Sequence, residues 1–380
     1  MKDETKLCHG ARPHDGVRMV NPSVERGSTV LFPDFESFVA RPRPRYYGRH
    51  GTDTHDALKE AVAGLEGAED VILTSSGLSA VNLTLLSFAR PGDDILVTDT
   101  AYDPVRSFCD HFLMKRGVSV RYYDPLIGEG IGDLIRPETT LIHTESPGSL
   151  TFEIQDLPAI VKAAGDIPVS IDNTWGAGYF LKPLALGVSI SVQSSTKYMG
   201  GHSDAFLGTI ATSKALGKKI KAEATLLGNQ TSPDDVYAIL KGIRTLPTRL
   251  KAHETQGLAL ARWLEDRPEV KRVLHPGLES HPQHALFKRD FTGASGLFSV
   301  VLERGDKAHT AAFINALNLF GLGYSWGGYE SLCLPAWPNT CRSAVPWEDD
   351  GQLLRFHAGL EDMGDLTTDL AKAFHTAARE

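Results

Sequence analysis

The sequence predicts an α/β protein with a mainly parallel sheet domain and a smaller C-terminal α/β domain. Two observations lead to this prediction. Apolar runs of strand length alternate with helical patterns through the first two thirds of the chain, and this alternation is typical of a parallel sheet covered on both faces. The chain also has 380 residues, which is too long for one small core and suits two domains.

The main domain is assigned to residues 52–243. A helix is expected from Asp53, because Leu58, Val62 and Leu65 share one helical face. The strands expected after it are Val71–Leu73, Ile95–Thr98, Val118–Tyr123, Thr140–His143, Val169–Ile171 and Ile190–Gln193. The helices expected between these strands include Ala80–Ala89, Pro104–Lys115 and Leu157–Ala164.

The C-terminal domain, residues 244–380, begins with an amphipathic helix expected at Thr248–Glu265. Its other expected elements are two strands and two helices, namely Leu297–Leu302, Leu353–His357, Lys307–Leu317 and Leu366–Ala377. Residues 1–51 form an N-terminal arm in which we expect an extended chain with little regular structure. That expectation rests on Pro22, Pro33, Pro42, Pro44, Arg41, Arg43 and Arg45. Aromatic residues in the arm, such as Phe32, Phe38 and Tyr46, predict that it docks against another surface.

Charge and cysteine content narrow the class of protein. Acidic residues outnumber basic ones by 47 to 39, for a net charge of -8. This argues against nucleic acids and anionic membranes as main partners, because both require clustered cations. The 4 cysteines include no Cys-x-x-Cys pair, which argues against a zinc or redox motif. The polar N-terminus shows no signal peptide. We therefore expect a soluble, cytoplasmic protein that acts on a small molecule and holds no metal.

The densest group of polar residues, Ser194–Asp204, follows the expected strand Ile190–Gln193. It places Lys197 at the carboxyl end of a strand, where open α/β sheets bind their ligands. A lysine amine can form an imine with an aldehyde, and the hydroxyls of Ser194 and Thr196 can bind phosphate beside it. Ser194 and Lys197 also match the Ser-x-x-Lys motif of acyl-transfer enzymes. No Lys-Thr-Gly accompanies it and a strand precedes the serine, so we set that interpretation aside.

Two more groups complete a candidate site for pyridoxal 5'-phosphate (PLP). Asp172 closes the strand Val169–Ile171 and can pair with the pyridine nitrogen of PLP. Ser76, Gly77 and Leu78 lie between a strand and a helix, and free N–H groups at a helix start bind phosphate. Each group alone also suits a plain turn. Together they indicate a PLP enzyme whose Schiff-base lysine is Lys197.

These motifs resemble the transsulfuration, or Cys/Met metabolism, family of PLP-dependent enzymes, and the resemblance covers nearly the whole chain. It includes Tyr46-Tyr47-Gly48-Arg49, Thr100-Ala101-Tyr102, Glu145-Ser146-Pro147-Gly148, His275-Pro276-Gly277, Tyr324-Ser325-Trp326-Gly327-Gly328-Tyr329-Glu330 and Leu354-Arg355-Phe356-His357. The resemblance implies the PLP-dependent transferase-like fold, known as fold type I. It also implies a homotetramer built as a dimer of dimers.

The resemblance implies roles for single residues as well. Tyr102 is similar to the tyrosine that stacks on the cofactor ring, and Arg355 to the arginine that grips the substrate α-carboxylate. Tyr47 and Arg49 are similar to residues that reach the cofactor phosphate of a neighbouring subunit. Ser325, Trp326 and Tyr47 are expected to contact the substrate.

The run Tyr324–Glu330 is most similar to the bacterial cystathionine β-lyase branch of the family, which implies a carbon–sulfur β-lyase. One residue departs from that branch, because His50 stands where a second arginine is usual near the distal end of the substrate. A histidine is only partly charged near neutral pH. A broader cysteine-conjugate β-lyase, a γ-lyase or γ-synthase, and a non-catalytic PLP-binding regulator remain alternatives.

Overall fold

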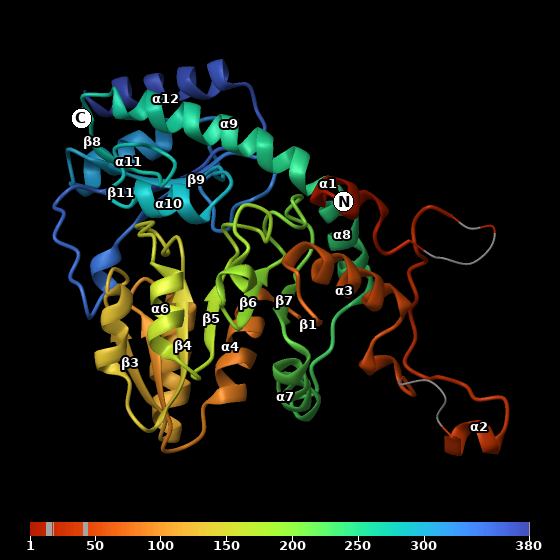
Figure 1. The fold of residues 1–380 in the computed structure, drawn as a ribbon. Helices are drawn as coiled ribbons and strands as arrows, with labels where there is room; N and C mark the ends of the chain where they lie inside the picture. The colour runs from red at the N-terminus through yellow and green to blue at the C-terminus, as the bar shows by residue number, and fades with distance from the viewer. Residues whose placement is uncertain (13–16, 18, 41–44, 380) are drawn as a thin grey trace.

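The computed structural model describes residues 1–12, 17, 19–40 and 45–379. Its main body consists of two sheets, and the seven-stranded sheet lies below the four-stranded one in Figure 1. In the described part of the chain, no helix combines the length and the apolar character needed to cross a bilayer. The predictions that rest on Arg41, Pro42, Arg43 and Pro44 concern residues outside the described ones.

The seven-stranded sheet confirms the predicted fold class. Its strands are β1 (Asp70–Thr74), β2 (Asp94–Thr98), β3 (Ser119–Tyr123), β4 (Thr139–Glu145), β5 (Val169–Asp172), β6 (Ile190–Ser194) and β7 (Gly208–Thr212). Their order is β1-β7-β6-β5-β4-β2-β3. The five neighbouring strands β3, β2, β4, β5 and β6 pair in parallel, whereas β7 runs antiparallel to both β1 and β6. The sequence analysis missed β7, which returns beside β6 after the polar loop that holds Lys197.

Helices cover both faces of this sheet. They are α3 (Asp53–Glu66), α4 (Gly77–Phe88), α5 (Asp103–Phe108), α6 (Leu157–Ala164), α7 (Lys214–Leu226) and α8 (Pro233–Arg244). Leu96 and Ile142 pack in one apolar layer with α3, α6 and α8. Ile95 and Leu141 pack in the opposite layer with α4, α5 and α7. Successive strand residues point to opposite faces, so a nearly continuous apolar run serves both layers.

The helix expected at Pro104–Lys115 forms in three parts. The α-helix α5 is followed by a π-helical turn, Cys109–Leu113, and a 3-10 turn, Met114–Arg116. Other 3-10 turns are Gly48–His50, Gly128–Leu134, Pro183–Leu186 and Pro338–Thr340.

The C-terminal part contains the four-stranded sheet, with order β10-β11-β9-β8 and only antiparallel pairs. Its strands are β8 (Val270–Leu274), β9 (Leu297–Leu302), β10 (Leu332–Ala336) and β11 (Leu353–His357), and its helices are α9 (Leu246–Glu265), α10 (His284–Asp290), α11 (Lys307–Ala316) and α12 (Met363–Ala377). The sequence analysis missed β8 and β10. Pro335 lies within β10, where its missing N–H is tolerated because β10 is an edge strand.

The arm differs from the expected extended chain, because it contains two short helices, α1 (Asp3–His9) and α2 (Phe35–Ala40). Leu7 of α1 is buried, and Arg244 donates hydrogen bonds to the carbonyls of Leu7 and Gly10, both at 3.1 Å. Helix α2 lies far from α1 in both views, beyond the edge of the main body in Figure 1. Its Phe35 and Phe38 are exposed. The docking of the arm and the boundaries at residues 51 and 243 stay predictions.

Candidate active site

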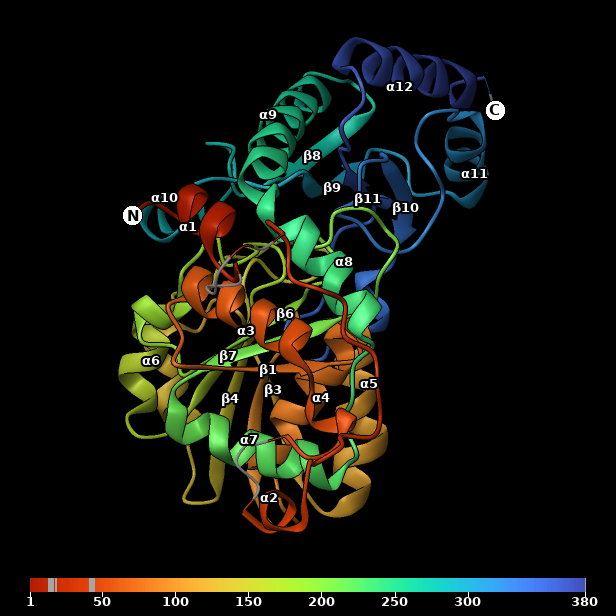
Figure 2. The same cartoon turned by 90° about the vertical axis from the view of Figure 1, so that its right-hand side faces the viewer.

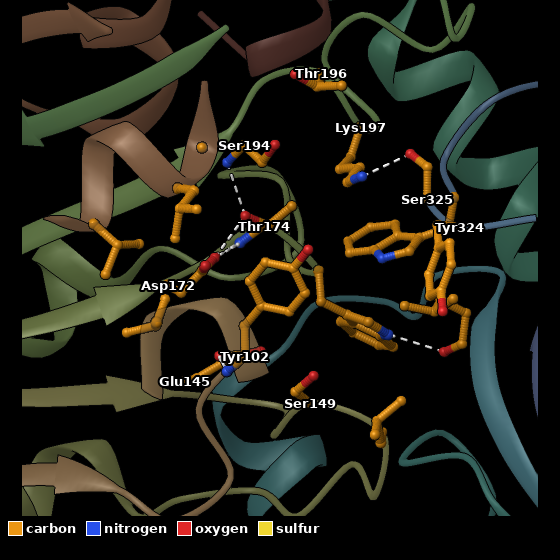
Figure 3. Close-up of a pocket in the computed structure, with 18 of the residues that line it drawn as sticks. Tyr102, Glu145, Ser149, Asp172, Thr174, Ser194, Thr196, Lys197, Tyr324 and Ser325 are labelled. Atoms are coloured by element: carbon orange, nitrogen blue, oxygen red, sulfur yellow. Dashed lines mark hydrogen bonds between the residues drawn. The ribbon is translucent and has the colours of Figure 1, made fainter. Parts of the chain in front are cut away.

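A cavity of about 240 Å³ lies where the carboxyl ends of β4, β5 and β6 meet the four-stranded sheet. The last residues of these strands are Glu145, Asp172 and Ser194, and neighbouring parallel strands carry them to the same edge. Lys197 follows in the turn after β6. The opposite wall comes from Arg355 on β11 and from the segment 324–326. Figure 3 shows Tyr102, Asp172, Lys197 and Ser325 arranged around one space.

Lys197 points into the cavity and donates a hydrogen bond from Nζ to Ser325 Oγ at 2.6 Å. Its Nζ lies 5.7 Å from the ring centre of Trp326. Burial, helped by the charge of Arg355 and opposed by Asp172, lowers the pKa of Lys197 to about 8. The amine therefore loses its proton more easily than an ordinary lysine, which suits both imine formation and proton abstraction.

Thr174 joins the ends of β5 and β6. Its hydroxyl donates to Asp172 Oδ1 at 2.5 Å and accepts from the backbone N–H of Ser194 at 2.8 Å. Burial raises the pKa of Asp172, while the hydrogen bonds from Thr174 and the charge of Lys197 oppose that rise. Burial and the nearby Asp172 raise the pKa of Glu145 well above its usual value. A cationic ring N–H placed between such carboxyl groups would be stabilised there.

The start of α4 is a candidate site for an anion. Ser76 is the N-cap and accepts from the N–H of Ser79 at 3.1 Å, and the first N–H groups of a helix lack intrahelical partners. A Cβ on Gly77 would come within 2.3 Å of the Cβ of Ser194, so only glycine lets α4 approach β6 this closely. Leu78 and Thr196 complete the lining. The site offers N–H and hydroxyl donors to a phosphate.

Tyr102 and Arg355 form two further walls. The Tyr102 ring faces the cavity (Figure 3) and is 46% exposed, and its backbone N–H donates to Glu145 Oε2 at 2.7 Å. Arg355 donates from Nη2 to the carbonyl of Ser325 at 2.8 Å. Burial lowers the pKa of Arg355 to about 10, so the guanidinium stays charged at neutral pH and suits a carboxylate.

The structure brings most of the predicted site residues together. Those that line the cavity are Ser76, Gly77, Leu78, Tyr102, Asp172, Ser194, Thr196, Lys197, Ser325, Trp326 and Arg355. The other three, Tyr47, Arg49 and His50, line two hollows that both include His55, near the start of α3. Within one chain they stand apart from Lys197, so any contribution to such a cavity would have to come from another copy.

Sequence reasoning gave no role to several cavity residues. Glu145 closes a buried strand just as Asp172 does, so the same signal was available for it. Thr174 lies in the Asp-Asn-Thr-Trp run and was overlooked. Ser149, Phe206 and Tyr324 also line the cavity, and no sequence pattern singled out Phe206.

The fold and this set of residues define a PLP-dependent enzyme. An amine with a lowered pKa, a phosphate site at a helix start and buried carboxyl groups match the aldehyde, phosphate and pyridine nitrogen of the cofactor. The residues present fit PLP. Ser76, Gly77, Leu78, Ser194 and Thr196 would hold the phosphate, Asp172 would face the ring nitrogen, and Lys197 would bind the aldehyde carbon.

The chain belongs to the Cys/Met metabolism PLP-dependent enzyme family, whose sequence profile matches residues 4–375. It is 47% identical over 382 residues to a putative cystathionine beta-lyase of Rhizobium johnstonii, covering 98% of this chain and 96% of that protein. It is 41% identical over 385 residues to the cystathionine beta-lyase of Salmonella typhimurium, covering 98% of both. The crystal structure of cystathionine gamma synthase from Xanthomonas oryzae in complex with cystathionine aligns with a TM-score of 0.91 and 31% identity, over 100% of this chain and 99% of that one.

The lowered pKa of Lys197 generates a prediction for cofactor attachment. With the pKa at about 8 instead of 10.5, the rate at which the apoprotein combines with PLP should rise with pH, half-maximal near pH 8. Arg355→Met removes a cation and should move the midpoint up, whereas Asp172→Asn removes an anion and should move it down. Stopped-flow absorbance gives the midpoints, and N-acetyl-lysine serves as the control for ionisation of PLP. A wild-type midpoint at the same pH as that of N-acetyl-lysine would contradict the prediction.

Proposed function

We propose that this protein is a PLP-dependent carbon–sulfur β-lyase that cleaves L-cystathionine to L-homocysteine, pyruvate and ammonia. The observation that best supports this proposal is that Lys197 and Arg355 both donate hydrogen bonds to Ser325. Ser325 accepts from Lys197 Nζ through its hydroxyl and from Arg355 Nη2 through its carbonyl, at 2.6 and 2.8 Å. The base and the carboxylate-binding cation are therefore held at a fixed separation, which suits removal of a proton from the Cα of an α-amino acid.

Each residue has a separate task in this mechanism. When bound, PLP supplies an electrophilic carbon for the substrate amine and a ring that stores the electrons released at Cα. Arg355 orients the α-carboxylate, and Lys197 Nζ takes the Cα proton. Asp172, held by Thr174, keeps a proton on the ring nitrogen. Tyr102 covers the ring and limits the access of water. The bond between Cβ and sulfur then breaks, and the sulfur leaves as the thiol of homocysteine after taking up the proton that Lys197 removed from Cα. Water then hydrolyses the remaining three-carbon fragment to pyruvate and ammonia.

Three alternatives apply to the same cavity. The similarity to a cystathionine gamma synthase favours γ-chemistry as the second candidate, which uses the same lysine and arginine. A broader β-lyase acting on other cysteine conjugates is the third. A non-catalytic PLP-binding regulator is the least supported, because it would not need a base and a carboxylate clamp fixed on the same serine.

Product analysis tests the proposal. Purified protein supplied with PLP and L-cystathionine should release pyruvate and homocysteine in equal amounts, because cleavage at Cβ leaves a three-carbon keto acid. Release of 2-oxobutyrate and cysteine would instead indicate γ-elimination. Lys197→Ala should reduce kcat by at least about 10³-fold, since it removes both the attachment point and the base. Lys214→Ala, which alters the first residue of α7, is the matched control and should keep wild-type activity.

We also propose that the functional unit contains at least two copies of the chain, in a cytoplasmic homotetramer. Tyr47 and Arg49 lie apart from the cavity of their own chain, and the arm that carries them exposes apolar side chains. A second copy that received the arm would cover those side chains and gain Arg49 as a ligand for the cofactor phosphate.

Subunit mixing tests this sharing. Lys197→Ala and Arg49→Ala subunits should each show little activity alone. A hybrid dimer combines one intact Lys197 with an intact Arg49 from the other chain at one of its two sites. Mixed subunits should therefore recover roughly a quarter of wild-type activity, since half of a random mixture is hybrid and half of its sites are complete. Native mass spectrometry confirms the exchange. Hybrids that form and stay inactive would show that the site uses residues of a single chain.

His50 generates a prediction about substrate choice. If His50 of one copy faces the distal end of the substrate in another, an arginine there would pair permanently with the far carboxylate of cystathionine. An exposed ion pair is worth about 0–1 kcal/mol, so His50→Arg should raise kcat/KM for cystathionine by up to about fivefold. S-methylcysteine has no distal carboxylate, so its kcat/KM should stay unchanged. Equal changes for both substrates would remove His50 from the distal site.

A further inference from the structure

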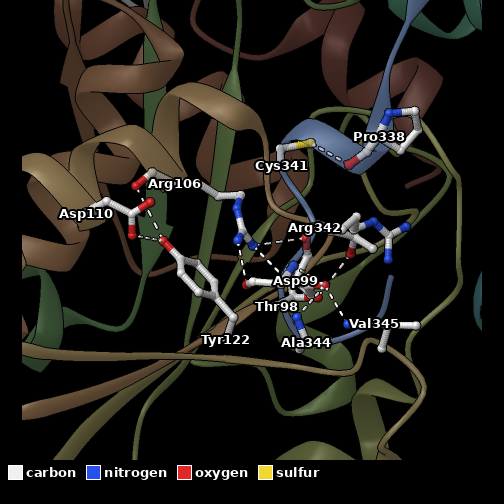
Figure 4. Close-up of polar contacts among 12 residues, drawn as sticks. Thr98, Asp99, Arg106, Asp110, Tyr122, Pro338, Cys341, Arg342, Ala344 and Val345 are labelled. Atoms are coloured by element: carbon white, nitrogen blue, oxygen red, sulfur yellow. Dashed lines mark hydrogen bonds and ion pairs between the residues drawn. The ribbon is translucent and has the colours of Figure 1, made fainter. Parts of the chain in front are cut away.

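The segment between β10 and β11 leaves the four-stranded sheet and lies against the seven-stranded one. We call residues 338–347 the strap. It begins with the 3-10 turn Pro338–Thr340 and continues past Arg342 to Val345, next to Asp99 at the carboxyl end of β2 (Figure 4). Two attachments hold the strap against this sheet: its backbone N–H groups bind the carboxylate of Asp99, and Arg342 forms an ion pair with Glu153. Neither has a part in the mechanism described above.

Asp99 makes the first attachment. Its side chain is 0% exposed and pairs with Arg106 Nη1 at 2.8 Å. The carboxylate accepts the backbone N–H groups of Ser343, Ala344 and Val345 at 3.0, 3.0 and 2.9 Å. Three successive N–H groups on one carboxylate fix the course of the strap, because leaving any of them buried without an acceptor would be unfavourable.

The first attachment lies at one wall of the active site. Asp99 follows β2 in the short turn that leads to Tyr102, and the N–H of Ala101 closes this turn on the carbonyl of Thr98 at 3.1 Å. Arg106 lies on α5, which begins directly after Tyr102. It donates to Ser343 Oγ at 2.8 Å. The strap thus holds both sides of the turn that presents Tyr102 to the cavity.

Arg342 makes the second attachment, to another wall. Its side chain is 5% exposed and donates to Glu153 Oε1 at 2.6 Å and to the hydroxyl of Thr151. Thr151 lies between Leu150 and Phe152, which line the cavity and have φ of 67° and 61°. Residues with a Cβ rarely adopt this left-handed conformation, and it persists only where surrounding contacts impose it. Arg342 supplies such contacts from outside the cavity.

We propose that Asp99 and Arg342 are positioning residues which, through the strap, hold the Tyr102 turn and the Ser149–Phe152 loop in one fixed arrangement. The strap joins these two walls, which belong to the seven-stranded half, to the sheet that carries Arg355. The inference goes beyond the proposed function, because it applies to any amino-acid substrate enclosed by these walls. Its kinetic test rests on that function.

A double-mutant cycle tests the coupling in the holoenzyme. Asp99→Asn keeps the size of the side chain but turns an amide N–H₂ toward the donors of the strap, and Arg342→Ala removes the second attachment. Each change should lower kcat/KM for cystathionine about tenfold, mainly by raising KM. If both act through the strap, the double variant should lose little more than either single variant. Arg342→Lys keeps the charge with fewer contacts and should restore part of the loss.

The matched control is Asp110→Asn. Asp110 accepts the hydroxyl of Tyr122 at 2.7 Å, next to Arg106 and without a contact to the strap in the described residues. Its kcat/KM should stay within about twofold of the wild type. A double variant whose loss equals the product of the two single losses, about hundredfold, would overturn the proposal. So would an equal loss in the Asp110 variant, because it would indicate a general disturbance of α5.

Hydrogen exchange separates this inference from the proposed function. The amides of residues 343–345 should exchange at least about tenfold faster in Asp99→Asn, and those of 149–153 in Arg342→Ala. Unchanged exchange at both segments would overturn the proposal. If the wild type does not cleave cystathionine, the proposed function fails. In that case two measurements still test the role of the strap. They are the exchange rates of these amides and the rate at which PLP dissociates from each variant.

Discussion

The site depends on one short link between two parallel strands. Thr174 donates to Asp172 and accepts from the N–H of Ser194, so a single hydroxyl joins the end of β5 to the start of the turn that carries Lys197. This link fixes the position of the Asp172 carboxylate relative to the turn that carries the Lys197 amine. A cofactor ring held as proposed would span the distance between these two groups, so a shift of either strand end would separate the ring nitrogen from Asp172. Gly77 completes the constraint, since any side chain there would push α4 away from Ser194.

The charges in the cavity form a second constraint. Asp172 and Glu145 are buried next to each other, and Lys197 and Arg355 face them. Burial raises the pKa of both carboxyl groups, and burial lowers the pKa of both cations. Burial therefore weakens the ionised form of each group, and a nearby opposite charge favours that form again, as Lys197 and Asp172 do for each other. A bound phosphate would add about two negative charges near neutral pH, and a protonated ring nitrogen would add one positive charge, which fits a site completed by its cofactor.

The remaining walls come from segments far apart in the sequence. The C-terminal part provides Arg355 on β11 and Ser325 in the segment before β10, and the strap returns from the four-stranded sheet to the Tyr102 turn. The positive φ of 82° at Ser325 shows that the segment next to Lys197 is also held in a conformation that its own residues do not favour. Contacts between distant segments compensate for this strain, as they do at Leu150 and Phe152.

The sequence by itself determined the type of sheet and the cofactor, and it indicated the residues that are proposed to bind that cofactor. Alternating apolar runs and helices specified the mainly parallel sheet. Charged residues at the end of a buried strand, or just after it, indicated Asp172 and Lys197, because these are local patterns. Other features depended on tertiary structure. Packing alone decided the antiparallel direction of β7 and the formation of helix α1 in the arm. It also decided the shared contact of Lys197 and Arg355 with Ser325, and the separation of Arg49 from the cavity of its own chain. Local patterns carry no information about which distant segments will meet, since that depends on how the two sheets and their connections fill space.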